Sequence, residues 1–252
     1  MVKIITFKPI QPNFISMRKL IFTALALPAL LAGCASECIE DSGNNIYIES
    51  TVKNFDEIEV EGAVKLVLKQ DSTYSIRIQA DSNIMKHITA DVSGRTLKVK
   101  MKDGKYCGTD SIVVYAGIGE LRKVNTDGAV KLVGDGRIYA NDVELKFTGT
   151  SDVDLDLSVS KLTTKIDGSG VLKLNGQAGI HDIDTKGTAK VEAFGFISGI
   201  YDIDIDGIGK ANINVLNDLK VKTSGSSEVY YKGNPKKVDE KKSGAAKLEK
   251  VN

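Results

Sequence analysis

Short stretches of alternating apolar and polar residues recur around a glycine between about Leu121 and Gly233. Apolar residues or threonines stand two and four places before each glycine, and a second series with the same alternation begins four places after it. By subtraction, successive glycines are 21, 19, 19, 20 and 18 residues apart. They are Gly128, Gly149, Gly168, Gly187, Gly207 and Gly225. The pattern predicts a repeated unit of two strands joined by a sharp corner.

Each predicted corner combines the glycine with small neighbours, such as Ala129, Thr150, Ser169, Thr188 and Ser226. Glycine tolerates positive φ and close backbone approach, which corners stacked on one another require. A third, shorter apolar piece follows each second strand. Units this short cannot bury an apolar face alone, so we expect a β-solenoid of about 18–21 residues per coil. An antiparallel sandwich is the competing interpretation, but its two-residue hairpin turns are rare here.

The rest of the proposed single domain, residues 46–252, is less regular. Residues 46–117 are expected to form broader strands that cap the solenoid, 118–233 its coils and 234–252 a Lys-rich tail. The hexapeptide Gly62–Val67 recurs letter for letter at Gly128–Val133, which indicates a corner of the same kind in the first half.

The N-terminus is predicted to be a targeting segment, residues 1–33. Arg18 and Lys19 precede an apolar run, Leu20–Leu31, and Leu-Ala-Gly-Cys follows as in a bacterial lipobox, which makes Cys34 the expected lipid attachment site. A plain secretory signal or a membrane anchor with a free Cys34 thiol is the alternative. Met17 is a better natural start than Met1, and residues 34–45 are interpreted as a polar tether.

Composition narrows the chemistry. The 252 residues carry a formal net charge of +1, which argues against a nucleic-acid partner. The two histidines, His87 and His181, are too far apart in sequence to indicate a zinc centre, and no nucleophile motif lies near His181, which is expected at an edge or surface. No catalytic residue is predicted.

Several segments together resemble a known family. They are Val52–Ile58, the Gly62 corner, the Gly94–Val99 strand, Gly233-Asn234-Pro235 and the Lys-rich Ser243-Gly244 end. In this order they resemble the GIN-head domain of auto-transporter adhesins, a domain of unknown function, over about Ile46–Asn252. The resemblance implies a right-handed parallel β-helix in a cell-envelope protein, often a lipoprotein of Bacteroidetes, and brings no catalytic residues.

The expected function is therefore that of a non-enzymatic protein, lipid-anchored to the outer membrane, that acts as an adhesin or binding module for a glycan or protein. Two alternatives stay open. One is a β-helical polysaccharide-processing enzyme, which the low aromatic content of 6% disfavours. The other is a structural envelope protein without an external ligand.

Two further sites are predicted from the residues. Lipidation of Cys34 would leave Cys38 and Cys107 as an even pair in an exported chain, so we expect a disulfide between them. Asp182, Asp184, Asp202 and Asp204 face outward on successive repeats and are candidate ligands for calcium. Alternatively, Lys165 and Lys220 or Lys222 on flanking repeats offset their charge, which leaves an ordinary solvated face.

Overall fold

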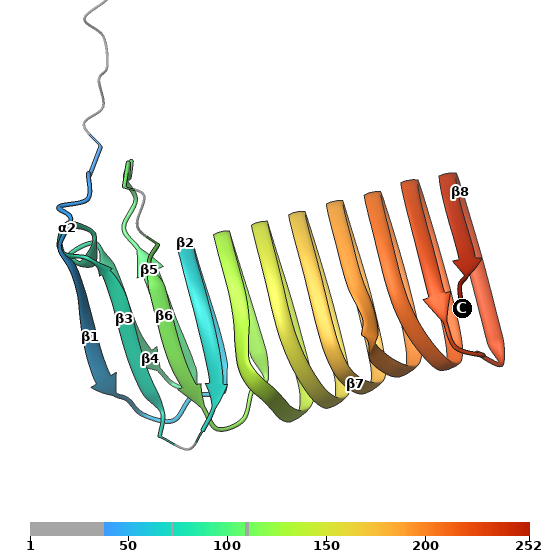
Figure 1. Cartoon of the computed structure of the whole chain (residues 1–252), viewed down its shortest axis with the longest axis horizontal. Coiled ribbons are helices and arrows are strands. Elements are labelled where there is room, and N and C mark those ends of the chain that lie inside the picture. Colours follow the sequence, from blue (N-terminus) through green and yellow to red (C-terminus); the bar gives the residue numbers. More distant parts are fainter. Residues whose placement is uncertain (1–37, 72, 109–110) are drawn as a thin grey trace, which may run out of the picture. The chain divides into compact units, whose positions relative to one another are not determined.

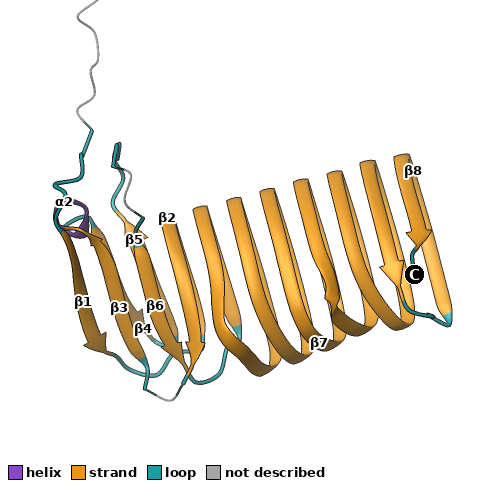
Figure 2. Cartoon of the chain, viewed as in Figure 1, coloured by secondary structure: helices purple, strands orange, loops and turns teal. Residues whose placement is uncertain are grey.

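The computed structural model describes residues 38–71, 73–108 and 111–252, and Ile39–Asn252 form one compact unit. This unit is all-β apart from a single helical turn (Figures 1 and 2). Its elements are β1 (Asn45–Thr51), β2 (Glu57–Gln70), β3 (Ser75–Asp81), α2 (Ser82–Met85), β4 (Ile88–Ser93), β5 (Thr96–Met101), β6 (Val113–Ile118), β7 (Lys123–Lys232) and β8 (Lys237–Lys250).

Strand β2 is bent at Gly62 and belongs to the sheet on both sides of the bend. Its first arm pairs in parallel with β5, and its second arm pairs in parallel with β6. Gly62 has a φ of 120°, a conformation that only glycine adopts without strain. Strand β7 pairs with both arms, with Gly62 opposite Gly128. The repeated hexapeptide therefore marks two corners that lie side by side.

Strand β7 winds through the successive repeats without a break in its strand structure (Figure 1). A β-carbon on any corner glycine of β7 would overlap the carbonyl oxygen of the corner glycine before it. The column starts at Gly62, includes the six glycines found in the sequence and ends at Gly244. The positive φ of each corner and the close stacking of the corners together explain why glycine recurs at this spacing.

Strand β8 corrects the expectation of a Lys-rich tail. Residues 237–250 form a 14-residue strand parallel to the end of β7, with Gly244 opposite Gly225. The alternation of apolar and polar residues does not reveal its corner, because charged residues occupy the inward positions before Gly244. Glu240 and Lys242 lie opposite the buried Val221 and Thr223 and form an ion pair of 3.2 Å. Inward charges of this kind discourage further pairing at a sheet edge.

The predicted right-handed parallel β-helix is wrong. The strands form one curled, half-barrel sheet in which parallel and antiparallel pairs are mixed. β1 pairs with β3, β3 with β6 and β4 with β5, all antiparallel. These strands continue the two arms of β2, so residues 46–117 extend the sheet and do not cap a solenoid. The period of the sequence indicates the repeats of β7, but it carries no information on the direction of strands that do not repeat.

The core lies along the inward rows of the repeats. At two corners, the residue two places before the corner glycine and the residue two places after it occupy the same inward space. Ile166 faces Gly170 and Ile205 faces Gly209, where a β-carbon would collide with the isoleucine side chain. This complementarity explains the second glycine in these two repeats.

Candidate functional site

One row of outward positions carries no charge in any repeat. It is the position directly after the corner glycine, and we call it the neutral row. Its members in β7 are Ala129, Thr150, Ser169, Thr188, Ile208 and Ser226. All of them are exposed. Ala63 of β2 lies opposite Ala129, and Ala245 of β8 lies opposite Ser226, so the row continues at both ends.

A shallow cleft of about 530 Å³ follows the neutral row across five repeats, from Thr150 to Ser226. Gly170 and Gly209 also line it, since they add no side chain to its floor. Lys190, Lys210 and Glu228 form its rim. The cleft is long, open and uncharged along its middle, which suits an extended ligand better than a compact one.

Packing does not force the neutral row to be small. Ile208 occupies the row with 62% of its surface exposed, so the fold accommodates a large side chain there. Four of the other five members carry a hydroxyl group, the fifth is alanine, and none is charged. Elsewhere on the surface the outward positions of neighbouring repeats carry many Lys, Asp and Glu residues. Small, uncharged side chains at these positions therefore indicate a surface kept clear for contact.

The floor of the cleft contains a polar atom that the protein leaves unsatisfied. Ser151 lines the cleft, is 4% exposed, and its hydroxyl has no hydrogen-bond partner among the described residues. Phe147, four residues earlier, fills the inward space of this repeat, which explains why residue 151 is small. Packing does not explain why it is a serine. A buried hydroxyl without a partner is unfavourable unless a water or ligand supplies one.

The charged rim is neutralised internally. Lys190 Nζ lies 2.5 Å from Glu192 Oε1, and Lys210 Nζ lies 3.6 Å from Glu228 Oε2. The hydrogen bond from Lys190 lowers the pKa of Glu192 below its usual value. Lys210 also lies 5.0 Å from the centre of the Tyr230 ring, on whose face Lys247 packs as well. The rim therefore presents no net charge that would favour an ionic ligand.

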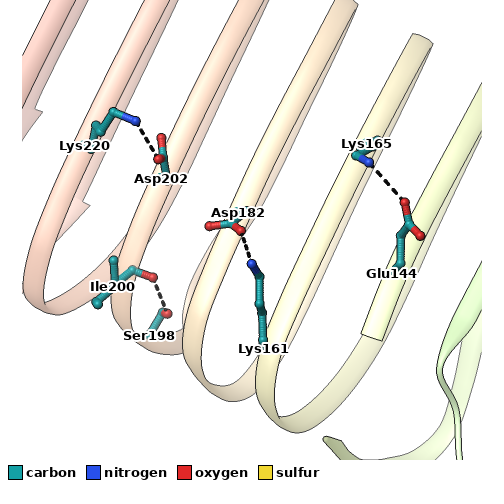
Figure 3. Close-up of polar contacts among 8 residues, drawn as sticks. All are labelled: Glu144, Lys161, Lys165, Asp182, Ser198, Ile200, Asp202 and Lys220. Atoms are coloured by element: carbon teal, nitrogen blue, oxygen red, sulfur yellow. Dashed lines mark hydrogen bonds and ion pairs between the residues drawn. The ribbon is translucent and has the colours of Figure 1, made fainter. Parts of the chain in front are cut away.

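Three of the four aspartates proposed for calcium form ion pairs with lysines. Asp182 Oδ2 lies 2.7 Å from Lys161 Nζ and Asp202 Oδ2 lies 2.7 Å from Lys220 Nζ (Figure 3). Asp204 Oδ2 lies 2.7 Å from Lys222 Nζ. Hydrogen bonds to these carboxylates raise the pKa of each of the three lysines. Asp184 contributes to the charge around Lys222.

These contacts favour the solvated, charge-balanced face over a metal site. Lys220 and Lys222 offset two of the aspartates as the alternative anticipated, whereas Lys165 binds Glu144 Oε1 at 3.1 Å (Figure 3). Glu144 also lies 3.6 Å from Lys123, and its lysine contacts lower its pKa. Within residues 38–71, 73–108 and 111–252, no three His, Cys, Asp or Glu side chains gather as a metal site would need. Calcium binding stays a prediction that the geometry does not favour.

His181 is fully buried, so its expected place at an edge or surface is wrong. Its Nε2 lies 3.1 Å from Thr164 Oγ1, and its ring packs against Phe196 and Tyr201, with ring centres 5.5 and 5.2 Å away. Burial lowers the pKa of His181 to about 3. The residue lies six places before Gly187, where neighbouring repeats have buried Leu162 and Tyr201. Extending the inward positions from two and four to six places before the corner glycine predicts that His181 is buried.

The cysteine predictions fall in different parts of the chain. Cys34 and the targeting segment lie outside the described residues. Cys38 and Cys107 are both disulfide-bonded in the structure. Beside them, Ile39 and Tyr106 form a parallel bridge, in which Ile39 N donates to Lys105 O and Cys107 N donates to Ile39 O. The pairing of Cys38 with Cys107 stays a prediction.

Residues 54–235 match the family described as "Putative auto-transporter adhesin, head GIN domain". The chain belongs to this family. The motif Phe55-Asp56 near the start of the match has a structural role, because Phe55 is buried and the buried Asp56 accepts hydrogen bonds from Arg95 Nε and Nη2. A search of curated proteins finds no match.

Solved structures share the fold at low sequence identity. A "putative adhesin" from Bacteroides fragilis NCTC 9343 is 20% identical, with a TM-score of 0.77, and the match covers 84% of this chain and 100% of that one. A "putative lipid binding protein" from Parabacteroides distasonis ATCC 8503 is 18% identical, with a TM-score of 0.61, over 86% of this chain and 100% of that one. A "putative adhesin" from Parabacteroides merdae ATCC 43184 is 21% identical, with a TM-score of 0.58, over 86% and 100%. At these identities the likeness concerns the fold alone.

Proposed function

We propose that this protein is a non-enzymatic, lipid-anchored adhesin of the cell envelope that binds a neutral, extended glycan along the neutral row. The observation that carries the proposal is the uncharged cleft across five repeats, bordered by charges that are already paired. The family points to a protein of the cell envelope or surface. In the described part of the chain, no helix has the length and apolar character of a membrane span.

The chemistry of the row suits a sugar polymer. Thr150, Ser169, Thr188 and Ser226 each offer a hydroxyl group, and adjacent strands of a sheet lie about 4.8 Å apart. A chain laid across the repeats therefore meets three hydroxyl groups on successive repeats, and a fourth at Ser226 beyond Ile208. The cleft lies on the face of the sheet and not at its edge, so a peptide could not add to it as a further strand.

Binding without catalysis is supported by the titratable groups of the cleft. Lys190, Lys210 and Glu228 are the lining residues that can titrate, and each takes part in an exposed ion pair. General acid–base catalysis of glycoside cleavage instead requires a pair of carboxyl groups placed on either side of the reacting bond. Lipid anchoring rests on the sequence around Cys34.

Binding of the full chain to immobilised neutral polysaccharides tests the proposal. We expect saturable binding without release of shorter products over time. The double variant Ser169→Lys/Thr188→Lys should bind at least about tenfold more weakly, a loss of about 1.4 kcal/mol. Thr148→Lys is the matched control, because it adds a lysine on the other side of a corner.

Three results would contradict the proposal. The first is equal binding by wild type and the double variant, which would place the ligand elsewhere. The second is time-dependent cleavage of a polysaccharide. The third is binding to glycan-free phosphatidylcholine vesicles but to none of the polysaccharides, which would assign this chain the lipid-binding role named for the Parabacteroides distasonis structure.

A further inference from the structure

Strand β1 leaves an apolar row of the core uncovered at its edge. Ile48 lies opposite Ile78, which lies opposite Val114, which in turn lies opposite Leu66. The last three side chains are 9%, 0% and 0% exposed, whereas Ile48 is 55% exposed. In the part of the chain that the structure describes, β1 pairs only with β3, so its outer edge offers free backbone N–H and C=O groups. Figure 1 shows β1 at the end of the sheet remote from β8.

The two ends of the sheet differ in how they are protected. At the far end, β8 contains five lysines within its 14 residues and turns the Glu240–Lys242 ion pair inward. Such charges discourage edge-to-edge association. β1 has the sequence Asn-Ile-Tyr-Ile-Glu-Ser-Thr, without lysine, proline or glycine. β4 is the edge strand at the opposite end of the order β1-β3-β6-β2-β5-β4, and its inward Ile88, Ala90 and Val92 are half-buried.

The pattern of β1 is complementary to itself. If two copies pair antiparallel about Ile48, the two Ile48 side chains meet, and Tyr47 of each copy lies opposite Glu49 of the other. Each copy already places the Arg77 guanidinium 6.0 Å from the Tyr47 ring and 4.5 Å from the Tyr115 ring. The Glu49 carboxylate of the second copy would thus approach a cation held beside Tyr47, and no like charges would stand opposite one another.

We propose that β1 is an interaction surface for a second copy of this chain, joined by antiparallel β1–β1 pairing. The contact is isologous, since the same seven residues serve both copies, and it extends the sheet across a twofold axis. Main-chain hydrogen bonds give such strand addition its geometry, and burial of Ile48 adds a hydrophobic contribution. One strand pair is a small interface, so covalent trapping detects it better than an equilibrium mass measurement.

Cysteine cross-linking of the full chain tests the pairing and its register. Ile48→Cys should give a disulfide-linked dimer under mild oxidation, because directly opposite Cβ atoms in an antiparallel pair lie about 4.5–5.5 Å apart. Val238→Cys is the matched control, since Val238 is an exposed apolar residue on the other edge, β8. It should form no disulfide-linked dimer, and neither should the wild-type chain. Thermal melting would verify that each variant is folded.

A second measurement uses the predicted register. A mixture of Tyr47→Cys and Glu49→Cys chains should give more cross-linked dimer than either variant alone. Folded Ile48→Cys protein that forms no disulfide-linked dimer would overturn the proposal, as would equal yields of linked dimer from Ile48→Cys and Val238→Cys. A dimer from Ile48→Cys without the expected preference in the mixture would overturn the antiparallel register.

Discussion

At the scale of single residues, His181 shows how the fold determines a side chain's chemistry. Its ring lies in the core between Thr164, Phe196 and Tyr201, and none of these carries a charge that would stabilise an imidazolium. Nδ1 is buried without a hydrogen-bond partner among the described residues. The same burial raises the pKa of the Tyr201 phenol, so both groups stay neutral in the folded protein. His181 is therefore a core residue and not a catalytic base.

The burial of His181 predicts a loss of stability in acid. Its pKa is about 3 in the folded protein and about 6.5 when unfolded. Between these values the unfolded chain binds a proton that the folded chain does not, so the free energy of unfolding falls as pH falls. The expected slope is about 1.4 kcal/mol per pH unit. Denaturant unfolding of wild type and His181→Leu between pH 7 and about 4.5 isolates this contribution. Parallel curves would contradict the burial.

Alanine substitutions at Gly168 and Gly136 separate the cost of a strained φ from the cost of crowding a neighbouring repeat. Gly168 has a φ of 130°, and a β-carbon there would overlap the Gly149 carbonyl, whereas Gly136 has a φ of 92° and open space around it. Gly136→Ala should cost about 1–3 kcal/mol from backbone strain alone. Gly168→Ala should cost more, because neighbouring repeats must also move apart. Thermal or denaturant unfolding measures both, and equal losses would show that corner stacking adds nothing.

At the scale of elements, the alternation within each repeat determines which side chains reach the core. Leu145 and Ile203 are both 0% exposed, while Lys146 is exposed. Leu145→Asp or Ile203→Asp should lower the free energy of unfolding by roughly 3–5 kcal/mol, since an unpaired charge would be buried. Lys146→Asp should change it little. Unfolding curves for the three variants test which residues face inward. A similar loss of unfolding free energy for Lys146→Asp would show that this assignment is wrong by one residue.

The sequence predicted the elements with a short period and missed those without one. The six corners of β7 are predictable because each repeat has a glycine with the same alternation of apolar and polar residues on both sides of it. Strand β8 was read as a tail because charged Glu240 and Lys242 occupy its inward positions. The directions of β1, β3 and β4 depend on how connections fold back in space, which a period of alternation does not encode.

At the scale of the whole molecule, the candidate site appears only when repeats are placed side by side. In the sequence, Thr150, Ser169 and Thr188 are small residues at predicted corners, where a sharp turn alone would account for their size. Ile208 in the same row shows that the turn accepts bulk, and the cleft shows that the uncharged row is continuous. The four aspartates predicted as calcium ligands, by contrast, are conspicuous in the sequence because they are charged. Their lysine partners on adjacent repeats assign them to surface ion pairs.

The most direct measurement of the central claim is an NMR titration of the full chain, labelled at threonine and isoleucine methyl groups, with a neutral polysaccharide that it binds. Ligand in the neutral row should shift the methyl signals of Thr150, Thr188 and Ile208, which line the cleft. The signal of Thr163, which lines a different, charged cleft, should stay unchanged, as should that of the buried Ile203. Shifts at Thr163 without shifts at Thr150, Thr188 and Ile208 would contradict the assignment of the binding surface.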